Sequence, residues 1–379
     1  MNPRPIEKSI MLESLELIPW QKLEHALGPA DDVPDLLRQL LVDDPGIRSN
    51  AVWTLYGNVF HQGSRYSATP YVVPFLIEIC KSDDIANRGE LLRFWGNLIT
   101  GFFSIRERPT WGDGTHVYFS GQILDVSLDD PYAAPLHQIY KNSLAGEELL
   151  YDLINENDIS LRAGAAWVLA CLPTIKERSL PKLLERLAVE TNPWVRSAIV
   201  FAAGELGEIN QLSRLINDPN QHRAVVCMAT CELSRLAPTE EVARKLLDFI
   251  AEPLECYEHI PGAGESSTGD AAFSLSCIPV ALRRSSIPAM CEKLENASRF
   301  ALLPLTNALL SAAFEPQFEP QTTLDEAQKR VLSSMVNTDD LWGIGNLYFT
   351  LDQYGLPHDR YSCAALLGMK LANCEELVF

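Results

Sequence analysis

A short phrase that recurs along the chain constrains its fold more than any other feature. The phrase is an Asp-Pro or Asn-Pro turn, then an arginine a few positions on, then an alanine-rich apolar segment. It occurs around Arg48, Arg162, Arg196 and Arg223, and only the copy at Arg162 lacks the proline. The last three arginines are spaced 34 (196 − 162) and 27 (223 − 196) residues apart, as in repeats made of two helices. The phrase predicts an all-α fold, an α-solenoid of antiparallel helix pairs.

The residues of each turn explain why a helix should begin there. Proline is tolerated in the first turn of a helix, and a preceding Asp or Asn caps the unpaired amides. Each arginine would then lie about one turn into the second helix of a pair. We expect it to bind a carboxylate or carbonyl of the same or the neighbouring turn; contact with a ligand is the alternative. The turns are Asp44-Pro45, Asp158, Asn192-Pro193 and Asp218-Pro219.

Two longer segments resemble a known repeat family. HQGSRYSATPYVVPFL, from His61 to Leu76, and RAGAAWVLACLP, from Arg162 to Pro173, are similar to segments of a group of bacterial HEAT-repeat proteins. The resemblance covers about residues 30 to 235. It implies stacked HEAT-like helix pairs but no established activity, because a solenoid is an extended binding surface and its fold does not fix its function.

Periodicity divides the chain into helical parts and two long loop insertions. Turn residues and alternation in the first insertion favour a small hairpin. Breaks at Pro19 and Gly28 predict an additional helix pair over residues 9–30. The segments 44–58 and 83–97 have the same length, which marks them as equivalent halves of the first two repeats. The helical parts are 1–100, 136–250 and 271–379, and the loop insertions are 101–135 and 251–270.

The charge of the chain bears on its partners. There are 31 basic and 50 acidic residues, for a formal net charge of −19. Such a charge repels nucleic-acid phosphates and anionic membranes and attracts basic proteins; solubility alone is the alternative explanation. We therefore expect a protein partner, a basic one in the sharper form of the hypothesis, and neither nucleic acid nor membrane. No apolar run is long enough for a signal peptide or a transmembrane helix.

The nine cysteines indicate a reducing compartment, because their number is odd and their spacing matches no disulfide framework. We therefore expect a cytoplasmic location. Cys227 and Cys231 share one face of an expected helix, but no second pair nearby completes a tetrahedral metal site. The sequence thus predicts neither a metal nor another cofactor.

Patterns that would indicate catalysis are weak. Cys256, His259 and Asp270 have the residue types of a nucleophile, a base and an orienting group, but they lie in one polar loop. The His-Glu pairs of di-iron HEAT-like hydroxylases are absent. We expect no catalytic residues. An enzyme or small-ligand protein that uses the 61–66 segment or the 252–270 loop is the alternative.

Candidate contact residues cluster in the first helix pairs. The 61–66 segment gathers an imidazole, a guanidinium and a phenol between two pairs, although a turn that satisfies helix ends is the alternative. Aromatic residues often anchor interfaces, while core packing is the alternative for the tryptophans. We predict a non-enzymatic scaffold that binds a protein along a concave face made by the second helices, in its sharper form an antitoxin or immunity protein against a basic effector. The predicted partner-binding residues are Trp53, Tyr56, His61, Arg65, Tyr66 and Trp167.

Overall fold

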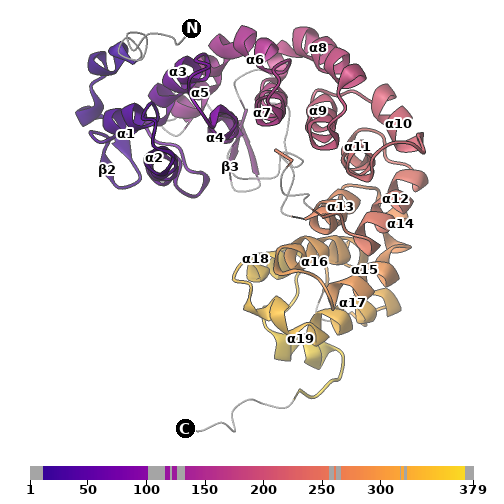
Figure 1. Cartoon of the computed structure of the whole chain (residues 1–379). Coiled ribbons are helices and arrows are strands. Elements are labelled where there is room, and N and C mark those ends of the chain that lie inside the picture. Colours follow the sequence, from indigo (N-terminus) through magenta and orange to yellow (C-terminus); the bar gives the residue numbers. More distant parts are fainter. Residues whose placement is uncertain are drawn as a thin grey trace. The chain divides into compact units, whose positions relative to one another are not determined.

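The chain is all-helical apart from two small hairpins over the residues that the computed structural model describes, and this confirms the all-α prediction (Figure 1). The described residues are 12–100, 116–119, 122–125, 133–255, 260–261, 266–315, 317–319 and 322–371. The helices are α1 Val33–Gln39, α2 Pro45–Val59, α3 Thr69–Cys80, α4 Arg88–Thr100, α5 Ala133–Ser143, α6 Glu147–Leu153, α7 Ile159–Ala170, α8 Lys176–Val189, α9 Pro193–Glu205, α10 Asn210–Asn217, α11 Arg223–Leu236, α12 Glu240–Ala251, α13 Ser267–Ser276, α14 Val280–Arg284, α15 Ile287–Leu294, α16 Arg299–Ala313, α17 Glu326–Asn337, α18 Leu347–Gln353 and α19 Arg360–Leu366.

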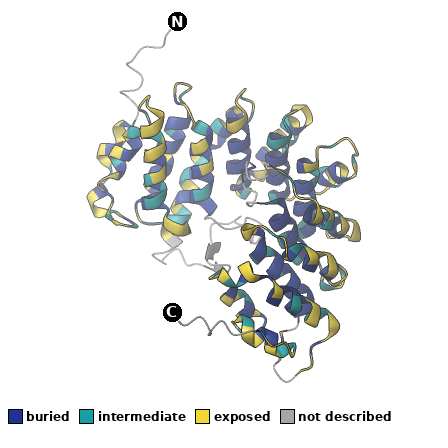
Figure 2. Cartoon of the chain, turned by 60° about the horizontal axis from the view of Figure 1, so that its bottom comes forward, coloured by how far each residue is buried: buried dark blue, intermediate teal, exposed yellow. Residues whose placement is uncertain are grey.

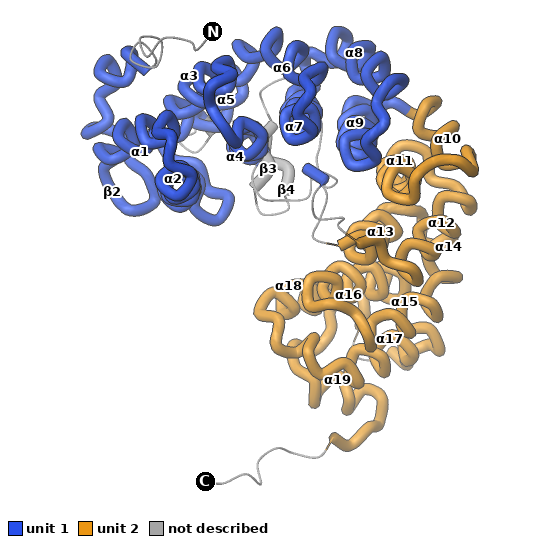
Figure 3. Tube along the Cα trace, viewed as in Figure 1, with its two compact units in different colours: residues 1–208, 260–262 blue, residues 209–259, 263–379 orange. Residues whose placement is uncertain are grey.

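The helices belong to two compact units, and each unit is a run of successive helix pairs (Figure 3). Unit 1 comprises residues 1–208 and 260–262, and unit 2 comprises residues 209–259 and 263–379. In unit 1, the pairs are α1/α2, α3/α4, α6/α7 and α8/α9, and the second helices α4, α7 and α9 pack side by side. In unit 2, the pairs are α10/α11, α12/α13 and α15/α16, and α13 packs against both α11 and α16. Sequential, repeat-like packing thus runs through each unit.

Three of the predicted turns begin helices through the same side-chain contact. The carboxylate of Asp44 before α2, the carboxylate of Asp158 before α7 and the amide oxygen of Asn192 before α9 each accept hydrogen bonds from two backbone N–H groups. An N-cap of this kind contributes about 1 kcal/mol. The donors are Gly46 and Ile47, Ser160 and Leu161, and Trp194 and Val195.

The fourth turn differs from the prediction. Helix α11 begins at Arg223 with His222 as its N-cap, and not at Pro219. The Asp218 carboxylate accepts hydrogen bonds from the Asn220 N–H and the Gln221 side chain instead. These contacts close a separate turn and delay the start of the helix by one turn.

The amino-terminal segment does not form the predicted helix pair. It contains two short 3₁₀ helices, Glu13–Leu17 and Trp20–Lys22, and a hairpin of β1 (Glu24–His25) and β2 (Gly28–Pro29). The runs between its prolines and glycine are too short to propagate an α-helix. Within the 101–135 insertion, the expected hairpin is confirmed by the antiparallel strands β3 (His116–Phe119) and β4 (Gln122–Asp125).

Arginines near the start of second helices bind the carbonyl groups at the end of a preceding helix. Arg196 donates from Nη1 to the carbonyl oxygens of Leu187 and Glu190, both at 2.8 Å, at the end of α8. The last carbonyls of a helix lack partners within the helix and carry partial negative charge, so a cation stabilises them. The prediction that Arg196 is structural is confirmed. Arg88 in α4 donates in the same way to Cys80 at the end of α3. Arg48 and Arg162 donate to carbonyl oxygens of the turns that follow α1 and α6, which are those of Val42, Glu156 and Asn157. Arg283, near the end of α14, donates to Ser276 at the end of α13.

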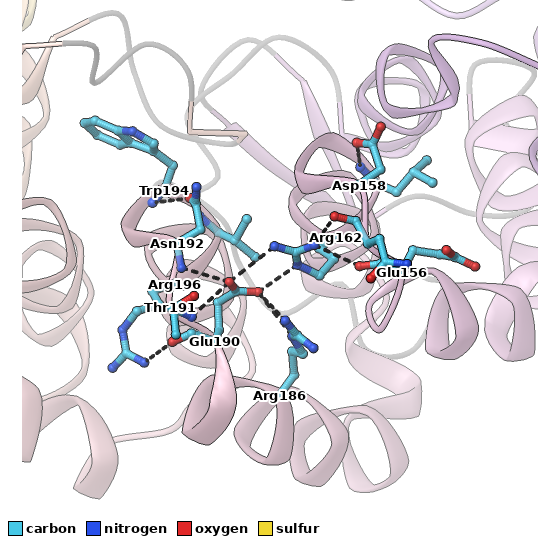
Figure 4. A network of polar contacts seen from close by, with 12 residues as sticks. Glu156, Asp158, Arg162, Arg186, Glu190, Thr191, Asn192, Trp194 and Arg196 are labelled. Carbon is cyan, nitrogen blue, oxygen red and sulfur yellow. Dashed lines mark hydrogen bonds and ion pairs between the residues drawn. The ribbon is translucent and has the colours of Figure 1, made fainter.

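A buried ion network extends this contact from one helix pair to the next (Figure 4). The Arg162 side chain in α7 donates from Nε to Glu190 Oε2 at 2.7 Å, and Arg186 donates to the same oxygen at 2.8 Å. Glu190 Oε1 accepts the backbone N–H groups of Thr191 and Asn192. Burial alone would raise the pKa of Glu190, but these hydrogen bonds outweigh it and lower the pKa to about 2. The network therefore holds a charged carboxylate between two helix pairs.

Glycines allow α4 and α7 to approach closely. A side chain on Gly96 would overlap the indole of Trp167, and one on Gly164 would overlap Leu92. Trp167 is 5% exposed and belongs to the core. Figure 2 shows that buried and exposed residues occur together along the helices. No described helix combines the length and the apolar character that crossing a membrane requires.

We expect two glycines of second helices to respond in opposite ways to alanine. Gly57→Ala should raise the free energy of unfolding by about 0.5 to 1 kcal/mol, because the site is open and alanine favours a helix. Gly96→Ala should lower it by about 1 to 3 kcal/mol, because the added methyl group overlaps Trp167. Urea unfolding of the two variants measures both effects. Equal effects would contradict the close packing of α4 on α7.

Glu190→Gln should destabilise the protein by about 3 kcal/mol at pH 7, because Arg162 keeps its charge and loses its buried carboxylate partner. The lowered pKa means that Glu190 contributes this stability above about pH 4.5, and that the contribution is lost as the pH falls towards 2. The difference between wild type and variant in urea unfolding should therefore shrink over that range. A difference that is the same at pH 6 and pH 2.5 would refute the assignment.

Candidate partner-binding surface

Among the tryptophans that the structure describes, Trp53 alone is exposed. It lies in the middle of α2 and is 80% exposed. An indole ring in water is unfavourable, and tryptophan is enriched among the residues that dominate binding at interfaces. Tyr56 and Gly57 follow at the third and fourth positions, so they share the helix face of Trp53.

Tyr56 is held rigidly beside this indole. Its ring lies 4.5 Å from the ring of Phe94 and 5.5 Å from that of Phe60, measured between centroids. Its hydroxyl accepts a hydrogen bond from the Asn97 side chain in α4. Burial raises the pKa of Tyr56, so the phenol is neutral at physiological pH. The half-buried ring therefore joins α2 to α4 and forms a fixed wall next to Trp53.

Open space and charge complete this surface. Apart from its chain neighbours and the backbone of its own helix, no atom lies within 4 Å of the position that a Cβ atom on Gly57 would take. Glu90 and Arg93 on α4 are exposed, and both act electrostatically on the Tyr56 hydroxyl. The space at Gly57, next to Trp53, can accommodate an apolar side chain of a partner. Glu90 and Arg93 supply charged groups nearby. We define the α2–α4 face as Trp53, Tyr56, Gly57, Glu90, Arg93 and Asn97.

Three residues of this face, Glu90, Arg93 and Asn97 of α4, could not be predicted as site residues from the sequence pattern. The available signal is the equal length of segments 44–58 and 83–97, which makes α2 and α4 equivalent second helices. Neighbouring second helices in a repeat stack pack side by side. That equivalence places α4 next to α2, but it does not show which side chains of α4 remain exposed.

The 61–66 segment lies directly after α2 and is built mainly as a turn. Gln62 and Gly63 both have positive φ angles, 50° and 81°. Arg65 donates from Nη1 to the Gly63 carbonyl oxygen at 2.6 Å, and the Tyr66 N–H donates to Thr69 Oγ1 at 2.8 Å at the start of α3. Both residues are half-buried, whereas His61 is exposed. These contacts favour the structural role for Arg65 and Tyr66.

Trp167 is not available to a partner, and its prediction as a contact residue is wrong. The residue lies in the α4–α7 interface, where Gly96 leaves room for the indole, and its ring is 5.8 Å from that of Phe201. All residues from Leu161 to Ala170 in α7 and from Ser197 to Gly204 in α9 are buried. The accessible surface expected along the second helices of unit 1 therefore does not extend over α7 and α9.

The segments that flank α2 and α4 carry exposed charges of both signs. Arg48, Arg65 and Arg88 each donate to a backbone carbonyl of unit 1. Arginines engaged in this way contribute less to the outer surface. The exposed charged residues of these segments include the carboxylates of Asp31, Asp43, Asp84 and Glu90 and the cations of Arg38, Lys81 and Arg93.

The described residues contain no cluster of three or more His, Cys, Asp or Glu that could hold a metal ion. Unit 2 has a cavity of about 290 Å³. Three of its four charged lining residues form ion pairs, since Arg284 binds Asp325 at 2.6 Å and Glu315 binds Arg283. The lining residues are Arg284, Ala313, Glu315, Gln317, Phe318, Glu319, Thr322, Asp325 and Gln328.

The loop considered for catalysis lies partly outside the described residues. Cys256 and His259 belong to the part that is not described. Asp270 lies in the first turn of α13 and is 9% exposed. The proximity of these three residues to one another thus stays a prediction.

Comparisons with known proteins assign no family. No protein-family model matches the chain, and no curated protein matches it. Among the solved structures that match is the crystal structure of an engineered protein from the Northeast Structural Genomics Consortium, with 14% sequence identity over 89% of this chain and 98% of that chain. The TM-score of 0.23 is too low for this similarity to support a fold or a function.

Proposed function

We propose that the chain is a HEAT-like α-solenoid that binds another protein through the α2–α4 face and catalyses no reaction. The observation that carries the proposal is the 80% exposure of Trp53 next to the restrained ring of Tyr56. Successive helix pairs within each unit support the solenoid architecture.

The face has the properties of a preformed interface. Tyr56 is already ordered by Phe94 and Asn97, so its side chain loses little conformational freedom on binding. Trp53 supplies a large apolar area that a partner can cover, and a buried tryptophan at the centre of an interface contributes about 2 kcal/mol or more. The affinity would therefore depend mainly on a few residues of α2.

The charge of the surrounding surface favours a basic partner. A net charge of −19 steers a basic protein towards the chain. The sharper form of the proposal is an antitoxin or immunity protein that covers a basic effector such as a nuclease. We also propose a cytoplasmic location, because the number of cysteines is odd and their spacing matches no disulfide framework.

Trp53→Ala should weaken partner binding without unfolding the protein, because its side chain is mostly in water. A partner retained by the wild type in a pull-down should dissociate about 30-fold faster from this variant, which corresponds to about 2 kcal/mol. Leu17→Ala is the matched control, because Leu17 is 83% exposed in the same unit but lies outside the face. Equal dissociation rates for Trp53→Ala and Leu17→Ala would count against the face.

Association with the partner should slow markedly between low salt and 0.15 M salt, because screening acts beyond a Debye length of about 8 Å. Stopped-flow measurements of the association rate test this. His61 was among the residues predicted to contact a partner, but it lies outside the α2–α4 face, so His61→Ala should leave binding through this face unchanged. If His61→Ala abolished turnover of a small molecule and the salt dependence were absent, the alternative of an enzyme that uses the 61–66 segment would replace the binding proposal.

A further inference from the structure

A second exposed aromatic group lies in unit 2, at α18 (Figure 1). Tyr348 is 47% exposed and Phe349 is 69% exposed, and their ring centroids are 5.3 Å apart in an edge-to-face arrangement. The ring of His358 lies 4.1 Å from that of Tyr348. We name Tyr348, Phe349 and His358 the α18 cluster.

Two sets of contacts hold the cluster in place: the buried leucines of α18, and a hydrogen bond to the imidazole of His358. Leu347 and Leu351 bury the opposite face of α18, at 3% and 0% exposure. Asp352, one helical turn after Tyr348, binds His358 Nε2 at 3.1 Å through Oδ1. These contacts fix the orientation of the imidazole against the tyrosine ring, so the aromatic surface exists before any partner arrives.

The exposed charged residues of the stretch that contains the cluster, residues 339–361, are mainly acidic. Arg360 is the only Lys or Arg between residues 339 and 361. It is engaged inside the unit, because its Nε donates to the Val336 carbonyl oxygen at 2.7 Å and its guanidinium binds Asp339. The exposed carboxylates of this stretch are Asp339, Asp340, Asp352 and Asp359.

We infer that the α18 cluster binds a cationic, arginine-rich segment of a partner protein. Exposed electron-rich ring faces attract guanidinium groups, which also stack on them, and neighbouring carboxylates accept the remaining N–H donors. Both features occur here within one short stretch, and an anionic segment would be repelled by the exposed carboxylates of that stretch. The inference does not rest on the α2–α4 face, since the cluster lies in the other unit.

The test uses the full chain and labelled peptides of nine arginines or nine lysines. Fluorescence anisotropy should show binding of the arginine peptide, with weaker binding of the lysine peptide. Phe349→Leu keeps the apolar bulk and removes the aromatic ring, and it should raise the dissociation constant of the arginine peptide about tenfold. Tyr348→Ala should do the same, whereas Asp352→Asn should reduce the salt dependence of binding.

Phe300→Ala is the matched control, because Phe300 is 65% exposed on α16 in the same unit but lies outside the cluster. It should bind the arginine peptide as the wild type does. The inference is overturned if Phe349→Leu and Tyr348→Ala bind normally, or if Phe300→Ala weakens binding equally, since net charge alone would then explain the attraction. Trp53→Ala should not change this affinity, so the two surfaces are tested separately. Circular dichroism confirms that each variant is folded.

Discussion

The contact between an arginine side chain and the carbonyl groups that end a preceding helix is the interaction on which the stack depends. The paired helices of unit 1 have between 7 and 15 residues, and helices of this length are marginal on their own. Each must be stabilised by its neighbours. Arg196 in α9 binds two carbonyls at the end of α8 and so ties the two helices of a pair together. Arg162 in α7 binds carbonyls of the turn that follows α6 and also binds Glu190, so one side chain links its own pair to the next pair.

The parts of the fold that could be predicted are those determined locally. An Asp or Asn before a proline caps a helix through contacts within three residues, which is why Asp44 and Asn192 mark helix starts in the sequence. The turn at Asp218 fails because its carboxylate has two competing donors nearby. The environment of Trp167 could not be predicted, because it depends on Gly96, which is distant in sequence and packs on the indole only after the repeats have stacked.

The same limit applies to the candidate site. Trp53 and Trp167 both lie in second helices within similar phrases, yet one is 80% exposed and the other 5% exposed. The difference follows from position in the stack: α7 has α4 on one side and α9 on the other, whereas α2 is the first second helix of unit 1. The helices that pack against a second helix decide which of its side chains are covered. The repeated phrase can be recognised in the sequence, but the exposure of a side chain within it depends on which helices pack around that copy.

The charge of the surface follows from the same architecture. Arginines that bind carbonyls at helix ends, such as Arg48 and Arg88, direct their guanidinium groups into the stack. The residues that cap helix starts carry their charge outward, since Asp44 remains exposed while it accepts backbone N–H groups. An Asp that caps the start of a helix therefore remains at the surface, whereas an arginine that binds carbonyls at the end of a helix points towards the neighbouring helix. The turns before α2 and α7 thus add an exposed carboxylate each, whereas Asn192 caps α9 and His222 caps α11. The proposed preference for a cationic partner draws on this arrangement in the first repeats.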